Sequence, residues 1–448
     1  MIVFFHLNFR SWRLGAIRYQ LRYTPLNSLR VAKIIIFNCY FCCFFNLNYS
    51  GEMTQSHRFQ SIDIMKGIIV LLMLFVNDLF LPGLPPWLSG IDQGHNGWGI
   101  AGWVFPAFLF MTGMTIPFAI QKKINNGLLP YEISRQIIGK SIILLTIGVM
   151  MVNTYRVNPD LTGLSRYLWA LLLFIAVFLV WNRYPEKENN FFTVISLRFA
   201  GLAIIVFLIF KFRSGSFENS GSLIVGWWDL PGLIGWGYLV SAFTFLAFRN
   251  SFTGTFLIWL SFLALNILCK LNLLGAIEPV RKYLGVITDG HVPFIILSGH
   301  LTGLILKRFS TSESRKIIML ILPFGIALMM TGFVLKKLFF IEGIYDNPSI
   351  AILCSGICLI LFIPLFWISD IKNNERWFLI FKPAGENALT TYFTSFIFYN
   401  LIWLCRFPLF FYKQSNNQLV ALAGSALLAL LMLFISSVII RLSIRLKI

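Results

Sequence analysis

The first long apolar run of the chain reads IMKGIIVLLMLFVNDLFLP over residues 64–82. A helix that crosses a bilayer needs about 20 mostly apolar residues, and comparable runs recur toward the C-terminus. The 448-residue chain is 57% hydrophobic and 12% charged, which is about half the charged fraction that is usual in soluble domains. Lipid must therefore cover most of the surface. This excludes a soluble enzyme, a nucleic-acid-binding domain and a disulfide-rich secreted module.

The apolar runs predict an all-α integral membrane protein, a polytopic bundle of about 11–12 transmembrane helices. No connecting segment is long enough for a soluble domain, so residues 53–448 are expected to form a single multi-span domain. The expected spans cover residues 64–82, 100–120, 141–155, 166–182, 194–210, 231–248, 254–273, 285–306, 316–335, 349–369, 384–405 and 418–440.

Residues 1–52 differ from the rest of the chain. They hold six basic residues and one acidic residue, and their single apolar run, 34–45, is too short to span a bilayer comfortably. Our hypothesis is that the natural chain starts at Met53 and that residues 1–52 are mis-assigned upstream sequence. The alternative is a basic amphipathic anchor that lies on the membrane surface.

The net charge of +19 is an orientation signal. Lys and Arg concentrate in cytoplasmic loops of multi-span proteins, and here the first loop expected outside, 83–99, has neither. The basic side chains predict cytoplasmic termini and a multi-pass protein, expected in a bacterial inner membrane. The inside loops and tail carry Lys122, Lys123, Arg135, Lys140, Arg183, Lys187, Lys307, Arg308, Arg315, Lys316, Arg441, Arg445 and Lys447.

Ionisable groups within membrane spans are costly and therefore mark candidate functional sites. On the predicted topology one set of polar residues falls near the outer membrane face, and a second set lies near the cytoplasmic end of the eleventh span. The outer set is Asn77, Asp78, Asp92, His95, Arg166, Asp289 and His291, and the inner set is Glu386 and Asn387.

His95 is the first candidate for catalysis. A histidine beside a carboxylate can take a proton from an amine or hydroxyl nucleophile and return one to a leaving thiolate. Asp92 lies three residues away, and Asp289 or His291 could approach from another helix. The alternatives are a solvated loop histidine and, for Asp289-Gly290, a turn that caps the following helix.

Glu386 and Asn387 follow a Pro-Ala-Gly sequence. The free backbone amides of a broken helix could face an anionic group such as a phosphate. The alternative is an ordinary helix start. No cysteine or histidine spacing forms a metal motif, so no metal is predicted.

Four segments resemble the heparan-alpha-glucosaminide N-acetyltransferase family and its bacterial relatives. RFQSIDIMKG (58–67) is similar to the "R-x-x-S-L-D-x-x-R-G" opening of membrane acyltransferases, and GWGIAGWVFPAFLFMTG (97–113) is similar to the family's "A-D-L-V-F-P-x-F-L-F-x-x-G" segment. GLSR (163–166) resembles "G-V-L-Q-R", and PAGENALTTY (383–392) resembles "P-A-G-x-N-A-L-x-x-Y".

The resemblance implies a membrane-embedded acyltransferase that passes the acetyl group of cytoplasmic acetyl-CoA to an amino sugar or other glycan on the outer side. The family's loop histidine, taken as the acetyl-carrying or base residue, falls at Asp92 here, or near Gly90 for relatives with a longer loop, and His95 is the nearest histidine. The family's Asp of "A-D-L-V-F-P" is Gly102. His95, Asp92, Asp289 and His291 are the predicted catalytic residues.

The predicted substrate-binding residues are Asn77, Asp78, Arg166, Glu386 and Asn387. The partners implied are membrane lipid, the acyl donor and the glycan acceptor, with no nucleic acid, and a homo-oligomer stays open. The alternative function is a multi-span transporter or flippase for a small polar or glycan-linked substrate. Against it, no internal repeat relates the two halves of the sequence.

Overall fold

The structure is a computed structural model that describes residues 59–79, 88, 99–184, 191–215, 219–225, 228–275, 278–309, 313–339, 347–374, 376–378, 380–407, 409, 412–413 and 417–446. The proposed leader, residues 1–52, lies outside the described residues. All described residues belong to the compact unit that begins at His57.

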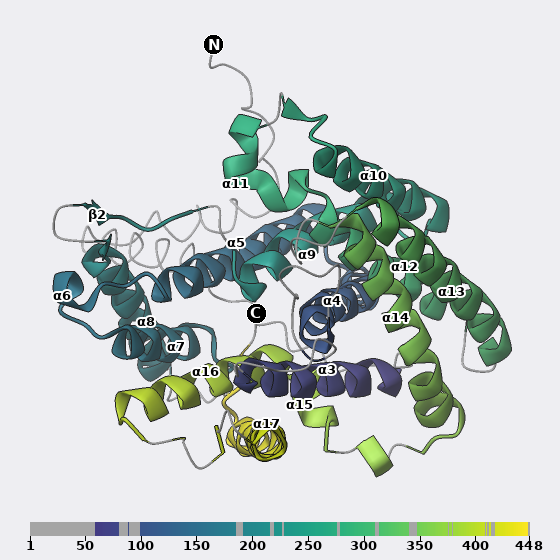
Figure 1. Ribbon diagram of the computed structural model, residues 1–448. Helices are drawn as coiled ribbons and strands as arrows, with labels where there is room; N and C mark the ends of the chain where they lie inside the picture. Colours follow the sequence, from purple (N-terminus) through teal and green to yellow (C-terminus); the bar gives the residue numbers. More distant parts are fainter. Residues whose placement is uncertain are drawn as a thin grey trace, which may run out of the picture. The chain divides into compact units, whose positions relative to one another are not determined.

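The described residues form twelve long helices, one for each apolar run of the sequence (Figure 1). Nine of them are long and apolar enough to cross a membrane, and α7, α12 and α16 are shorter or less apolar. This confirms the prediction of an all-α polytopic membrane protein. The twelve are α3 (Gln60–Asp78), α4 (Ile100–Asn125), α5 (Pro130–Thr154), α7 (Arg166–Trp181), α8 (Phe191–Lys211), α9 (Leu230–Phe248), α10 (Phe252–Lys270), α12 (His291–Arg308), α13 (Ser314–Leu338), α14 (Pro348–Phe366), α16 (Ala388–Leu404) and α17 (Gln418–Arg441).

Two of the predicted spans are interrupted. The run 285–306 divides at Gly290, whose left-handed φ of 70° ends α11 (Glu278–Thr288) before α12 begins. The run 384–405 divides at Asn387 into α15 (Lys382–Glu386) and α16. Both breaks lie at or beside polar residues inside runs that are apolar on average, so the mean hydropathy does not show a change of backbone direction.

Short elements fill the connections. They are α6 (Pro159–Thr162), an antiparallel hairpin of β1 (Ser214–Gly215) with β2 (Ser220–Gly221), a π-helix at Trp367–Ile371 and a 3₁₀ helix at Arg376–Phe378.

Burial separates inner from outer helices. The most apolar window of α4 is 72% buried, whereas that of α8 is 17% buried, and large apolar side chains such as Phe192 and Phe210 on α8 are exposed. A helix that is apolar all round belongs in a protein core or in lipid. We infer that α8, α10, α13 and α17, each a third or less buried, face lipid around α3, α4, α9, α12 and α14.

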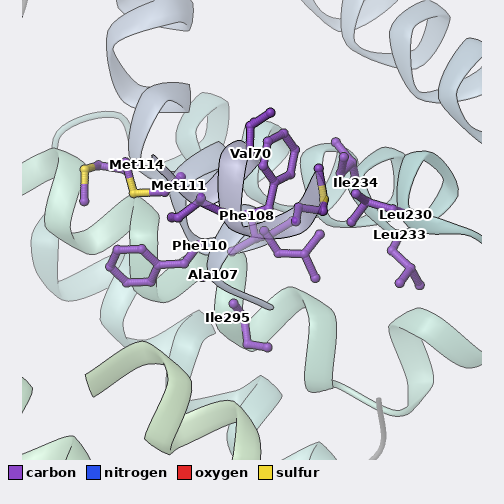
Figure 2. Close-up of a cluster of buried hydrophobic side chains, with 14 of the residues drawn as sticks. Val70, Ala107, Phe108, Phe110, Met111, Met114, Leu230, Leu233, Ile234 and Ile295 are labelled. Carbon is purple, nitrogen blue, oxygen red and sulfur yellow. The ribbon is translucent and has the colours of Figure 1, made fainter. Parts of the chain in front are cut away.

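The core is built around α4. Figure 2 shows side chains of α4, among them Phe108, Phe110, Met111 and Met114, together with residues of α3, α9 and α12. A methyl group on Gly113 of α4 would overlap the carbonyl oxygen of Ile296, and one on Gly299 of α12 would overlap that of Phe110. Small residues let membrane helices approach this closely.

A second glycine contact joins two of the family-like segments. A methyl group on Gly67 of α3 would overlap the carbonyl oxygen of Phe381, and one on Gly385 of α15 would overlap that of Asp63. The opening segment and the Pro-Ala-Gly segment therefore pack backbone against backbone. This contact holds α15, and with it the start of α16, against α3.

Candidate functional site: two cavities on five shared helices

The first cavity, called the Arg166 cavity, has a volume of about 430 Å³. It contains two predicted residues, Asn77 at the end of α3 and Arg166 at the start of α7. Its described lining is Asn77, Phe105, Thr154, Tyr155, Arg166, Tyr167, Asp229, Tyr392, Ser395, Phe396, Tyr399, Asn400, Trp403 and Lys413.

Helix starts place two charged groups in this cavity. Ser165 caps α7 by accepting a hydrogen bond from the N–H of Leu168 at 3.2 Å, which puts Arg166 in the first turn. Asp229 caps α9, and its Oδ1 accepts a hydrogen bond from the N–H of Leu230 at 2.6 Å. Burial raises the pKa of the Asp229 carboxyl, although that hydrogen bond opposes the shift.

One wall of the Arg166 cavity is aromatic. The rings of Tyr167 and Trp403 stack with centroids 6.2 Å apart and planes 13° apart. The Arg166 guanidinium lies 4.8 Å from the Tyr167 ring centroid and donates a hydrogen bond to the Tyr167 hydroxyl at 2.7 Å. The cavity thus combines a flat apolar surface with charged and amide groups, as sites for small polar ligands do.

Asp78 lies beside this cavity without lining it. Its side chain is fully buried, and Oδ1 stands 2.9 Å from Nζ of Lys413, which does line the cavity. The hydroxyl of Tyr412 donates to the same oxygen at 3.2 Å. Burial and the neighbouring Asp78 carboxylate raise the pKa of Tyr412 above its ordinary value. Asp78 therefore holds Lys413 in place at the end of α3.

The second cavity, called the lysine cavity, has a volume of about 290 Å³ and contains Glu386 and Asn387 as well as three lysines. Its described lining is Lys66, Phe108, Thr112, Thr115, Ile116, Ala119, Lys123, Lys140, Leu144, Ile234, Tyr238, Gly385, Glu386, Asn387, Ala388, Leu389, Thr390 and Leu446.

Positive charge dominates the lysine cavity. Lys66, Lys123 and Lys140 stand against one carboxylate, Glu386, among the described lining residues. The Lys123 ammonium is buried and has no hydrogen-bond partner within the described part of the chain. The break at Asn387 also brings the N-terminus of α16 to this cavity, and helix N-termini favour anions.

The same five helices line both cavities. Along α3, Lys66 lies in one cavity and Asn77 in the other, about 16 Å apart at 1.5 Å per residue. The same holds for α4, α5, α9 with its cap Asp229, and α16. The separation is narrow on α4, where Phe105 and Phe108 are one turn apart and line different cavities. The cavities therefore open toward opposite ends of one helix group.

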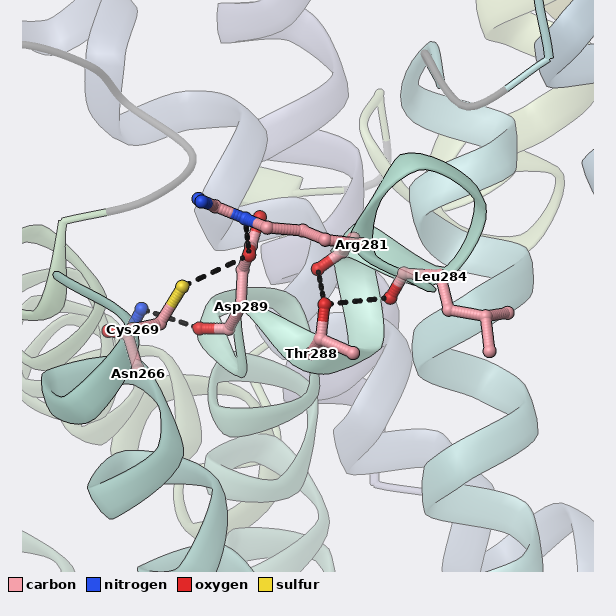
Figure 3. Close-up of polar contacts among 7 residues, drawn as sticks. Asn266, Cys269, Arg281, Leu284, Thr288 and Asp289 are labelled. Atoms are coloured by element: carbon pink, nitrogen blue, oxygen red, sulfur yellow. Dashed lines mark hydrogen bonds and ion pairs between the residues drawn. The ribbon is translucent and has the colours of Figure 1, made fainter. Parts of the chain in front are cut away.

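Asp289 and His291 line neither cavity among the described residues. Figure 3 shows Asp289 between α10 and α11. Its Oδ1 accepts a hydrogen bond from Nε of Arg281 at 2.8 Å, and its backbone oxygen accepts one from Asn266 at 2.7 Å. The turn at Asp289 and Gly290 precedes α12 with Gly290 at the N-cap, and His291 is buried in the first turn. These contacts fix the junction of α11 and α12.

Asp92 and His95 lie outside the described residues. Nothing in the sequence indicated that Tyr155, Asp229 and Lys413 would line a cavity. Asp229 precedes Leu-Pro-Gly, which indicates a capped helix start with proline in the first turn, so this aspartate looks purely structural in the sequence. Only tertiary packing shows that it lines a cavity.

Within the described residues, no group of three or more His, Cys, Asp or Glu side chains could hold a metal ion. A family model described as a domain of unknown function (DUF5009) matches residues 58–227.

Heparan-alpha-glucosaminide N-acetyltransferase of Mus musculus is 27% identical over 162 residues, which are 34% of this chain and 24% of the mouse protein. The Homo sapiens protein of the same name is 31% identical over 103 residues, 23% of this chain and 15% of the human protein. The chain thus spans a quarter or less of these curated relatives. The matches confirm the resemblance indicated by the sequence segments.

Proposed function

We propose that this chain is a membrane-embedded acyltransferase that moves an acetyl group from acetyl-CoA to an amino sugar or another glycan acceptor. The observation that carries the proposal is the pair of cavities on five shared helices. One cavity is rich in lysine, and the other combines Arg166, Asp229 and an aromatic wall. The distant similarity to an N-acetyltransferase supports the same reaction class.

The lysine cavity suits the donor. CoA carries phosphate groups, and Lys66, Lys123 and Lys140 provide positive charge next to the N-terminus of α16. Glu386 and Asn387 would contact the polar part of the donor. Because Phe105 and Phe108 are one turn apart on α4, a thioester reaching from the lysine cavity needs to cross only about 5 Å along that helix.

The Arg166 cavity suits the acceptor. The stacked Tyr167 and Trp403 offer an apolar surface for the face of a sugar ring, and Asn77 and Arg166 offer hydrogen-bond donors. α3 ends and α4 begins on either side of residues 92–95. His95, with Asp92, remains the proposed acetyl-carrying or base residue. Asp289 and His291 receive no role, because they line neither cavity among the described residues.

The distribution of Lys and Arg orients the reaction. We infer that the lysine cavity faces the cytoplasm of a bacterial inner membrane and the Arg166 cavity faces the outside, because basic residues concentrate in cytoplasmic loops. Acetyl-CoA would then enter from the cytoplasm, and the acceptor would bind from the other side.

The test uses purified full-length protein in lipid nanodiscs with radiolabelled acetyl-CoA and glucosamine. Label should pass to glucosamine. Lys123→Ala should weaken acetyl-CoA binding about tenfold or more, since one charge-assisted contact contributes roughly 1.5–3 kcal/mol. Lys122→Ala is the matched control, because the neighbouring Lys122 does not line the cavity. This variant should bind the donor as tightly as the wild-type protein does.

Equal weakening by both variants would show that general surface charge, rather than the lysine cavity, attracts CoA. Absence of acetyl-CoA binding in the wild-type protein would contradict the proposal and favour the transporter. Binding without transfer to glucosamine would call for other amino sugars before the reaction class is abandoned.

A further inference from the structure

We propose that Asp229 is a catalytic residue of the Arg166 cavity and accepts the proton of the acceptor's amine or hydroxyl group. The inference rests on the acyl transfer proposed above, takes that transfer as direct from the thioester to the acceptor, and gives Asp229 the base role that the family resemblance alone implies for His95. Among the described lining residues of this cavity, Asp229 is the one carboxylate. It belongs to none of the family-like segments.

The contacts of Asp229 leave one oxygen for a substrate. Oδ1 accepts the N–H of Leu230, and no donor within the described part of the chain bonds to Oδ2. A general base must lie within hydrogen-bond reach of the proton that it removes. The cavity around Asp229 is large enough to hold a sugar-sized group against the Tyr167 and Trp403 wall.

The neighbouring groups complete the arrangement. The charged and titratable side chains that share the cavity with Asp229 are Tyr155 at the end of α5, Arg166 and Tyr167 on α7, Tyr392 and Tyr399 on α16, and Lys413 before α17. The Lys413 charge is balanced by the buried Asp78 carboxylate. Arg166 has no carboxylate partner among the described residues and could stabilise the oxyanion that forms on the acetyl carbonyl.

The step balances without another reactant. The acceptor nitrogen or oxygen attacks the thioester carbon, its proton passes to Oδ2 of Asp229, and the new C–N or C–O bond forms. The C–S bond then breaks, and its electron pair leaves on the CoA sulfur. The protonated Asp229 returns the proton to this thiolate, which is the stronger base because a free thiol has a pKa near 8.5.

Burial favours this role, because it raises the pKa of Asp229 above that of an exposed aspartate. A base with a raised pKa binds the incoming proton more strongly, and efficiency is best when the pKa lies near the working pH. The sign of the pH effect follows. Activity requires the ionised carboxylate, so it is present above the raised pKa and lost as the pH falls through it.

The competing explanation is that Asp229 is only the cap of α9. Asparagine caps helices about as well as aspartate, so Asp229→Asn retains the cap and removes the base. This distinguishes the two roles within a single position. Ser251→Ala, which removes the cap of α10, serves as the control for a lost cap away from both cavities.

The experiment measures acetyl transfer from radiolabelled acetyl-CoA to glucosamine by the full-length protein in nanodiscs. Asp229→Asn should lower the rate constant for transfer about 10²- to 10⁴-fold, the usual contribution of a general base, with wild-type acetyl-CoA affinity and thermal midpoint. Its residual activity should lack the acidic decline of the wild type. Asp229→Glu should recover part of the rate, and Ser251→Ala should keep nearly all of it.

Asp229→Asn activity within about threefold of wild type would overturn the role of Asp229 and leave the acyltransferase proposal standing. An Asp229→Asn protein that loses thermal stability together with activity would assign the residue to the cap instead. A wild-type protein that transfers acetyl to no amino sugar would overturn both proposals.

Discussion

Asp78 shows how a charged residue is tolerated at the end of a membrane helix. A buried carboxylate is stable only when it is paired and hydrogen-bonded, and Lys413 and Tyr412 supply both interactions. The sequence identified Asp78 as unusual because acidic residues are rare in apolar runs. In the structure its carboxylate contacts Lys413, which lines the Arg166 cavity, and Asp78 itself is not among the described lining residues.

This pair gives a stability prediction. Lys413→Met should leave the Asp78 charge unpaired and lower the free energy of unfolding by about 3 kcal/mol, the lower range for breaking a buried pair, because 23% of the Lys413 side chain is exposed. Lys316→Ala removes the exposed pair with Glu313 and should cost less than about 1 kcal/mol. Unfolding in detergent would measure the loss of stability in both variants. Equal losses would contradict the burial of the Asp78–Lys413 pair.

At the scale of elements, the contact between α3 and α15 decides where α16 begins. Gly67 and Gly385 allow the backbones to touch. The chain then turns at Asn387, which brings the N-terminus of α16 to the lysine cavity. Two segments that look like separate family motifs thus act as one packing unit. This gives a physical reason for glycine in each.

Replacing one of these glycines tests the packing unit. Gly385→Ala should force α15 away from Asp63, lower stability by about 1–3 kcal/mol as overpacking does, and weaken acetyl-CoA binding. Gly139→Ala in α5 is the matched control, because nothing lies near the added methyl group and alanine favours a helix. Thermal midpoints and donor titration should separate the two variants. A Gly385→Ala protein with unchanged binding would remove α15 from the donor site.

At the scale of the whole bundle, the described residues form an even number of long helices, so the first and the last of them can begin and end on the same side. The start of α3 and the end of α17 meet at one end, since Lys66 and Leu446 both line the lysine cavity, and the Leu446 N–H donates to Oγ1 of Thr390 at 3.0 Å. The Arg166 cavity opens toward the other end. The proposal that the lysine end faces the cytoplasm rests on the distribution of Lys and Arg in the loops.

Cysteine labelling in intact cells would test that orientation. The background chain has serine at Cys405 and at the three cysteines of residues 1–52, so that its remaining cysteines are buried. A membrane-impermeant maleimide should label Tyr155→Cys from outside, and it should label Asn126→Cys only after the membrane is opened. The reverse pattern would place acetyl-CoA binding on the outer side.

The sequence by itself predicted about 11–12 spans and their approximate positions, because each bilayer crossing needs a long apolar run that is visible without any contact information. It also singled out Asn77, Arg166, Glu386 and Asn387, since polar groups stand out against such runs. It could not show that the first two share one cavity and the last two another, because that depends on how α3, α7 and α16 pack.

The tertiary structure alone showed which groups surround Asp78, Asp229, Asp289 and His291. In the sequence they are similar polar residues near helix ends. Packing pairs Asp78 with Lys413 and Asp289 with Arg281, buries His291 in α12, and leaves one oxygen of Asp229 for the Arg166 cavity. A charge in a membrane protein is either satisfied by a neighbour or kept for a ligand, and only the folded contacts distinguish the two cases.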